Sequence, residues 1–144
     1  MSRLKDGYPT TITFSASSSA AALIFEKSVT PPSVSAGGEN DTTTMRNDVW
    51  RTKQPKALKT LGEASFVAAY DPAFYDEVVG MIGVNQQITI NYPDDSTLMF
   101  WGWLDEFTPG ECVDGAQPTA ACRIIASNEN DSDEETAPVY TAPA

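Results

Sequence analysis

The sequence predicts a mainly β fold: an antiparallel β-sandwich or partial barrel with one flanking α-helix and a long docking loop. Three observations support this prediction. Short segments in which apolar and polar residues alternate recur along the chain, as in half-buried strands. One convincing helix-start signal occurs, at Asp71-Pro72. A stretch rich in Pro, Gly and Thr runs from Val29 to Leu58, and loops of that length in small domains are usually functional or disordered.

The N-terminal part is expected to contain two strands. Residues 8–14 alternate, with Tyr8 on the inward face, and residues 21–27 alternate in the same way. A small polar run joins the two segments, so they are predicted to form a hairpin. The pairs Pro31-Pro32 and Gly37-Gly38 then argue against regular structure in the long loop.

The middle of the chain is expected to contain a strand followed by the only helix. Residues 61–70 are predicted as the strand. Asp71 is a typical N-cap residue, and Pro suits the first helical position. Gly83 is a plausible stop for a helix of about three turns. Apolar residues recur at helical spacing between these two signals, at Phe74, Val78, Met81 and Ile82.

Two further strands and a closing strand follow. Residues 87–92 alternate and are followed by a Pro-Asp-Asp-Ser turn. Residues 98–104 are apolar on both faces, which favours a central strand or one covered by a partner. Trp101 and Trp103 share one face of that strand, where a contact between subunits would cover them. Residues 119–126 are predicted to close the sheet.

The sequence divides into a domain at 1–126 and an acidic C-terminal tail at 127–144. Within the domain, residues 29–59 form the long loop, here called the arm. Its apolar Met45 and Trp50 cannot be buried by the arm itself, so it is expected to dock on something. Residues 128–135 carry no apolar side chain, and this part of the tail is predicted to be disordered unless a partner orders it.

Charge is unevenly distributed in this chain of net charge −11. Residues 60–144 hold Arg123 against 15 acidic residues, a net charge of −14. Residues 46–59 hold five basic residues against Asp48 alone, a net charge of +4. Such a run is either a solvated loop or the basic part of a subunit that meets the acidic surface of another copy. The basic residues are Arg46, Arg51, Lys53, Lys56 and Lys59.

Catalytic and cofactor chemistry finds little support. The chain has no histidine, which excludes Ser-His-Asp and Cys-His catalysis and the usual zinc sites. Asp105 and Glu106 are neighbours on a strand and are expected on opposite faces. Cys112 and Cys122 flank the last turn and are expected to be free thiols. The protein is therefore predicted not to be an enzyme and to need no cofactor or metal.

Nucleic-acid and membrane binding are also disfavoured. Trp50 within a basic segment is the combination that stacks single-stranded bases, but the net charge of −11 opposes phosphate binding. The longest apolar runs are far shorter than a membrane span, and no signal peptide is visible at the start of the chain. A cytoplasmic site of synthesis is the expectation.

Several motifs occur in one order over roughly residues 37–126. They are Asp41-Thr42-Thr43-Thr44-Met45, a link at 55–58, a strand starting near Gly62, Tyr70-Asp71-Pro72, Tyr92-Pro93-Asp94-Asp95, residues 100–109 and the last strand at 122–126. Each motif alone is weak, but together and in this order they resemble the major tail protein, or tail tube protein, of long-tailed, siphovirus-type bacteriophages.

The resemblance implies a virion protein of the tail, assembled in the cytoplasm of the host bacterium. In this family, six copies close into a ring, and rings stack into a tube with an acidic lumen through which DNA passes without specific binding. The other partners implied are the tape-measure protein and the tail terminator and tip proteins. The arm would be the inter-subunit element that reaches the neighbouring ring.

The predicted inter-subunit contacts combine the arm residues with the two tryptophans of the apolar strand. An alternative is a carbohydrate-binding β-sandwich of a virion or cell surface, with the tryptophans as an exposed stacking platform. The predicted contact residues are Met45, Arg46, Trp50, Arg51, Lys53, Lys56, Lys59, Trp101 and Trp103.

Overall fold

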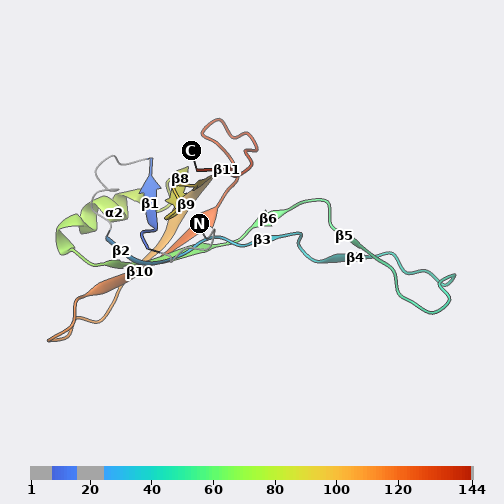
Figure 1. The fold of residues 1–144 in the computed structure, drawn as a ribbon, viewed down its shortest axis with the longest axis horizontal. Coiled ribbons are helices and arrows are strands. Elements are labelled where there is room, and N and C mark those ends of the chain that lie inside the picture. Colours follow the sequence, from blue (N-terminus) through green and yellow to red (C-terminus); the bar gives the residue numbers. More distant parts are fainter. Residues whose placement is uncertain (1–7, 16–24, 144) are drawn as a thin grey trace.

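One antiparallel sheet of seven strands forms the body of the molecule in the computed structural model, which describes residues 8–15 and 25–143 (Figure 1). The strand order is β1-β8-β9-β10-β7-β2, and β11 also pairs with β9. This confirms the predicted mainly β fold with an antiparallel sheet. The strands are β1 Thr11–Phe14, β2 Phe25–Thr30, β7 Ala64–Ala69, β8 Gln86–Asn91, β9 Thr97–Pro109, β10 Thr119–Ala126 and β11 Val139–Thr141.

The sheet curves until its two edge strands, β1 and β2, approach each other. There the Ile12 N–H donates a hydrogen bond to the Glu26 Oε1 at 3.0 Å. The body is therefore the partial-barrel form of the predicted fold. Its inward side chains form a single core, in which the largest fully buried residues are Ile12, Phe14, Ile88, Ile90, Phe100, Leu104 and Ile124.

The predicted N-terminal hairpin is wrong. Strand β1 pairs with β8, with Phe14 opposite Ile88, while β2 pairs with β7, with Val29 opposite Phe66. The two strands therefore lie at opposite ends of the strand order, because each pairs with a strand far away in the sequence and not with the other. Residues 21–24 of the predicted second strand lie outside the described residues. Tyr8 is exposed instead of inward, because β1 begins only at Thr11.

The helical segment begins and ends where the sequence predicts. A 3₁₀ turn, η1 (Pro72–Phe74), leads into α2 (Tyr75–Met81). The Asp71 Oδ1 accepts a hydrogen bond from the Ala73 N–H at 3.0 Å, as expected for an N-cap. Gly83 follows with a φ of +79°, a conformation that favours glycine, and its N–H bonds the Leu104 carbonyl. Val78 and Met81 pack α2 against the sheet.

The C-terminal tail is ordered, so the predicted disorder is wrong. Strand β11 pairs with residues 97–99 of β9, just beyond the part of the same strand that pairs with β10. The acidic segment before it is closed by a hydrogen bond of 2.7 Å from the Thr136 N–H to the Asn128 carbonyl. The Asn85 side chain also donates to the Glu129 carbonyl at 2.8 Å. Backbone pairing to the body thus orders a segment that carries no apolar side chains.

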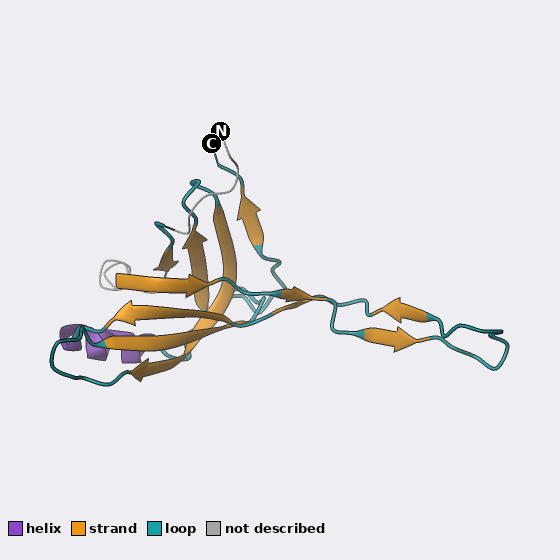
Figure 2. Cartoon of the chain, turned by 60° about the horizontal axis from the view of Figure 1, so that its bottom comes forward, coloured by secondary structure: helices purple, strands orange, loops and turns teal. Residues whose placement is uncertain are grey.

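The arm is a narrow two-stranded ribbon, so the predicted lack of regular structure is wrong (Figure 2). Its first two residues complete β2. Strand β3 (Val34–Ser35) then pairs with β6 (Thr60–Leu61), and β4 (Glu39–Asp41) pairs with β5 (Lys53–Pro55). Gly37 and Gly38 lie between the two short pairings with φ of +79° and +98°, so they allow a bend and not a break.

Candidate assembly interface

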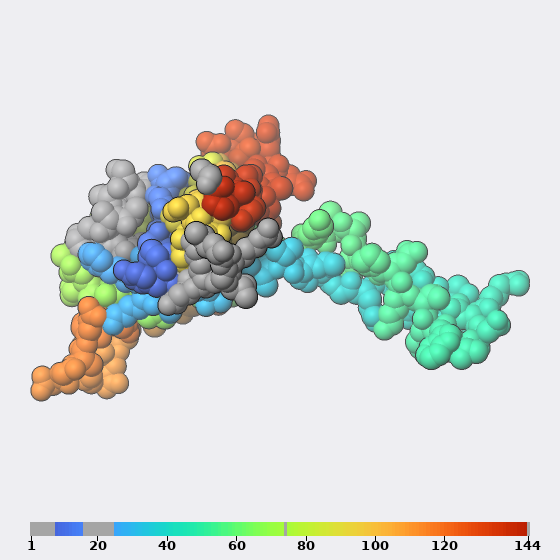
Figure 3. Space-filling model, viewed as in Figure 1, coloured from blue at the N-terminus to red at the C-terminus, as the bar shows by residue number. Residues whose placement is uncertain are grey.

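The arm projects from the body (Figure 3). Several of its large apolar side chains are exposed to solvent. Trp50 is 82% exposed and Met45 is fully exposed. No hydrophobic core lies beneath these side chains among the described residues, because the buried cluster is confined to the body. Exposed large apolar residues gathered on one projecting element mark an interaction site. The exposed apolar residues of the arm are Val34, Met45, Val49, Trp50 and Leu58.

Hydrogen bonds order the arm tip (residues 42–52) in place of a core. The Thr42 N–H donates to the Thr52 carbonyl at 3.0 Å, and the Thr52 N–H donates to the Thr43 hydroxyl at 3.0 Å. Asn47 links the two sides of the loop: its Nδ2 donates to the Trp50 carbonyl at 2.8 Å, and its Oδ1 accepts the Thr44 N–H at 3.0 Å. The tip therefore holds its shape before it meets a partner, which lowers the entropy cost of binding.

The sequence analysis did not predict that Asn47 links the two sides of the arm tip. The residue types indicated it, since Thr and Asn side chains such as Thr44 and Asn47 bond nearby backbone groups and favour turns. The basic charge of the segment indicated its lysines and arginines as contact residues instead. The tip also encloses a shallow hollow of about 540 Å³, lined by residues that include Met45, Val49 and Trp50.

The basic charge of the arm is partly neutralised across the ribbon. Lys53 Nζ lies 2.7 Å from Glu39 Oε2, and Arg51 Nη1 lies 3.7 Å from Asp41 Oδ2. A hydrogen bond from Thr43, together with the charge of Lys53, lowers the pKa of Asp41. Among the described residues, the basic arm side chains outside any ion pair are Arg46, Lys56 and Lys59. These three cations are the ones available to a partner.

Trp101 and Trp103 lie on the outer face of β9, opposite the core side chains Phe100 and Leu104. Both tryptophans are half-buried, and the Trp103 Nε1 donates to the Asp105 Oδ1 at 3.4 Å. They lie in the body, away from the arm tip, so the structure does not bring the predicted contact residues together within one chain.

A β-bulge on the same strand corrects the expectation for Asp105 and Glu106. The register between β9 and β10 pairs Arg123 with Glu106 and Ile124 with Leu104, so Asp105 is an extra residue. Both carboxylates consequently reach one guanidinium, with Arg123 Nη2 at 2.5 Å from Asp105 and 3.6 Å from Glu106. Arg123 Nη1 also lies 3.9 Å from Glu63. Arg123, the only basic residue among residues 60–144, thus organises three carboxylates on the outer face.

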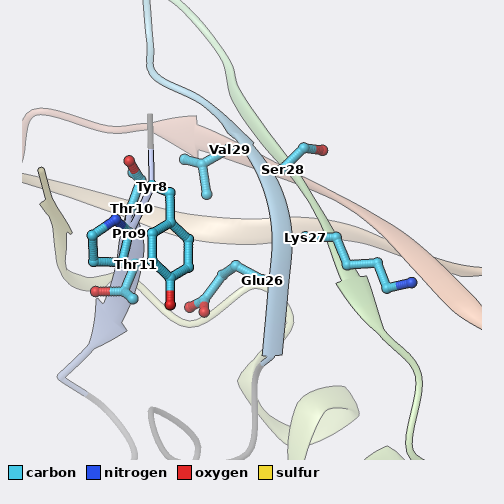
Figure 4. A pocket seen from close by; sticks show the side chains of 8 residues that line it. All are labelled: Tyr8, Pro9, Thr10, Thr11, Glu26, Lys27, Ser28 and Val29. Atoms are coloured by element: carbon cyan, nitrogen blue, oxygen red, sulfur yellow. The ribbon is translucent and has the colours of Figure 1, made fainter. Parts of the chain in front are cut away.

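A groove of about 520 Å³ follows the seam between the edge strands β1 and β2 (Figure 4). Glu26 extends across it toward β1, where it accepts the Ile12 N–H, while Lys27 points away. One side-chain hydrogen bond therefore spans part of the opening where a backbone ladder would close a full barrel. Edge strands of this kind are sites where another chain can add a strand.

The described residues show little further chemistry. They contain no group of three or more His, Cys, Asp or Glu that could hold a metal ion. Cys112 is exposed and Cys122 is buried; both are free, as predicted, and burial raises the pKa of the Cys122 thiol to about 12. Within the same residues, no helix has the length and hydropathy needed to cross a membrane.

The chain shares its fold with chains from three solved tail and baseplate assemblies. A chain from the tail of an empty GTA particle, refined with C6 symmetry, has a TM-score of 0.67 at 13% identity over 96% of this chain and 100% of its own. A chain from the virion of a native gene transfer agent particle has a TM-score of 0.68 at 14% identity over the same shares. A chain from the 6-fold symmetrised baseplate of the anti-feeding prophage has a TM-score of 0.65 at 9% identity over 99% and 98%.

No family model matches the sequence, and neither does the sequence of any curated protein. The similarity is therefore one of fold, shared with chains from gene transfer agent particles and from a prophage baseplate. At the level of the fold, it confirms the resemblance to phage tail proteins that the motif order indicated. The long-tailed type of phage stays a prediction.

Proposed function

We propose that this protein is a structural subunit of a phage-type tail, in which six copies form a ring and the rings stack into a tube. The fold supports the proposal because the similar chains belong to tail and baseplate assemblies described with C6 or 6-fold symmetry. The protein would then reside in the virion tail of a long-tailed phage, after assembly in the host cytoplasm. The tube would conduct the genome into the host cell.

The observation that carries this proposal is the ordered, uncovered arm. Its tip is fixed by hydrogen bonds, yet Met45 and Trp50 remain in water. Exposed apolar surface on an element ordered in advance is typical of a docking segment that a partner covers. A second copy of the same chain supplies that partner in a homo-oligomeric tube, with the free cations of the arm meeting an acidic body.

The remaining features fit the same proposal. Ring closure would give the edge strands β1 and β2 neighbours and so remove open sheet edges. An acidic surface that lines the lumen would repel phosphate, so DNA would pass without specific binding. The protein would have no catalytic role and no cofactor. Its other contacts would be with the tape-measure protein along the lumen and with terminator and tip proteins at the tube ends.

Electron microscopy of the purified protein tests the proposal. We expect rings or tubes from the wild type and folded, unassembled protein from a variant that carries Lys56→Glu and Lys59→Glu. The matched control is Lys56→Arg with Lys59→Arg, which keeps the charge and should keep assembly. Wild-type protein that stays monomeric at high concentration, together with normal tails after deletion of its coding sequence, would overturn the proposed function.

A further inference from the structure

Helix α2 and the residue after it carry apolar side chains that the body covers only in part. Val78 and Met81 point into the core, whereas Tyr75 and Val79 lie on a second side of α2. Ile82 follows just after the helix ends, where it forms a β-bridge to Leu104, and the Tyr75 ring also contacts Phe107. The side chains of Tyr75, Val79 and Ile82 are 46%, 43% and 38% exposed. The apolar surface of α2 is thus wider than its contact with the sheet, and the extra part faces solvent.

The charges around these exposed side chains are acidic. Asp76 lies in the first turn of α2 and is exposed, and the capping residue Asp71 is exposed just before it. At the arm tip, exposed Met45, Val49 and Trp50 lie near Arg46 in the sequence, a cation outside any ion pair among the described residues. Arg51 is paired with Asp41, and the exposed Asp48 adds a negative charge, so Arg46 is the cation that the tip can offer to a partner. Both surfaces are apolar, and the unpaired Arg46 complements the acidic first turn of α2.

The two surfaces lie at opposite ends of the molecule. Figure 1 shows α2 at one end of the longest axis and the tip of the arm at the other. An arm therefore cannot reach α2 of its own chain. It can reach α2 of another copy placed end to end. Such a contact joins two different surfaces of identical subunits, so each subunit can offer its arm to one neighbour and its α2 to another.

We propose that the exposed side of α2 with Tyr75 and Val79, together with the adjoining Ile82, is the docking site for the arm tip of a second copy of this chain. The inference rests on the proposed function and assigns the receiving surface that the function requires. Trp50 and Met45 cover these apolar side chains, and Arg46 lies against the acidic first turn of the helix.

Cross-linking between two variants tests this contact directly. Both carry Cys112→Ser, which removes the exposed thiol, while the buried Cys122 thiol stays protonated and unreactive. One variant adds Met45→Cys and the other adds Val79→Cys. After the two are mixed and assembled, we expect a short bis-maleimide to yield a covalent dimer. The control replaces Val79→Cys by Thr108→Cys, an exposed position on the outer face of β9, and should give no dimer.

A second experiment uses charge in place of cross-linking. Val79→Lys keeps a good helix former on an exposed position but puts a cation where the basic arm would land. We expect it to reduce assembly at least tenfold in sedimentation, while Val113→Lys, at a valine of similar exposure in the β9–β10 loop, has no effect.

The results separate this inference from the proposed function. The α2 site would be wrong if Val79→Lys forms tubes as readily as the wild type does. It would also be wrong if Met45→Cys cross-links to Thr108→Cys and not to Val79→Cys. Either result leaves the proposed tail function standing. Wild-type protein that forms no assembly at all would overturn both.

Discussion

Arg123 binds Asp105 across a β-bulge, with Nη2 at 2.5 Å from Oδ2. The extra residue in β9 turns Asp105 and Glu106 to the same side, and the guanidinium also approaches Glu63. Without Arg123, three carboxylates would remain close together on the outer face of the sheet. The pair therefore keeps both the bulge and its acidic surroundings in place.

Replacing Arg123 is expected to destabilise the protein in a pH-dependent way. Hydrogen bonding to Arg123, with a smaller contribution from Trp103, lowers the pKa of Asp105. A carboxyl with a lowered pKa stabilises the fold above its ordinary pKa of 3.8, and this stabilisation disappears as the pH falls through the lowered value. We expect Arg123→Gln to lower the melting temperature modestly at pH 7.

The test compares melting temperatures of the two proteins across pH. The gap between wild type and Arg123→Gln should close in acid, because protonated carboxyls no longer need the cation. Arg123→Lys should fall between the two, since an ammonium keeps the charge and loses the fork geometry. A gap that is constant from pH 7 to strong acid would show that the contact acts through packing and not through charge.

Two glycine substitutions are expected to have opposite effects. A Cβ on Gly102 would lie 2.4 Å from the Ile125 carbonyl oxygen, which is backbone and cannot move aside without disturbing the β9–β10 ladder. We expect Gly102→Ala to cost about 1–3 kcal/mol in the free energy of unfolding. Gly80, within α2, has open space around it, and Gly80→Ala should stabilise the protein by about 0.5–1 kcal/mol. Urea denaturation of both variants and of the wild type measures whether the free energy of unfolding falls in Gly102→Ala and rises in Gly80→Ala.

Assembly and stability are expected to respond to different aromatic residues. Trp50→Ala should change the free energy of unfolding by less than about 0.5 kcal/mol, because the side chain is exposed, but it should abolish assembly. Phe100→Ala removes a fully buried ring and should cost about 3–5 kcal/mol. Chemical denaturation and sedimentation velocity on the same samples check both effects. A large loss of stability in Trp50→Ala would mean that the arm packs on its own body.

The two cysteines should differ sharply in reactivity. Cys112 is exposed and should react with a thiol reagent in the native protein. Burial raises the pKa of Cys122 to about 12, so its reactive thiolate is scarce at pH 8, and we expect reaction only after unfolding. Spectrophotometric titration with and without denaturant measures this, with Cys112→Ser as the control. Equal reaction rates for the two thiols in the native protein would contradict the burial of Cys122.

Local patterns predicted the elements that local interactions decide. Strand β10 occupies residues 119–126 as expected, and Asp71 caps the helical segment because its carboxylate needs only a neighbouring N–H. The acidic turn before β9 also forms as predicted, with Asp94 Oδ1 accepting the Ser96 N–H at 3.1 Å. The helix cap and the turn each depend on a hydrogen bond between residues close in the sequence, and strand β10 was indicated by its alternating apolar and polar residues.

The predictions that were wrong concern segments whose structure depends on contacts with residues far away in the sequence. The pairing of Phe14 with Ile88 leaves no local trace in residues 8–14. The bulge at Asp105 depends on the register of β10, and the order of residues 128–135 depends on Asn85 and on the pairing of β11 with β9. For the candidate interface, charge and exposed aromatics indicated the arm, while its ribbon form and the role of Asn47 required the structure.

The tip of the arm is ordered but has no hydrophobic core of its own, so its exposed side chains contribute little to the folding of the body. Its hydrogen bonds run among residues 42–52, whereas the buried cluster belongs to the body. Under the proposed function, substitutions at Met45, Val49 or Trp50 would consequently change which copies can assemble with each other and leave each copy folded. Assembly between copies of diverged sequence would then be lost through changes in the arm tip and its proposed docking surface alone. The arm tip would thus set which subunits assemble together, independently of how each subunit folds.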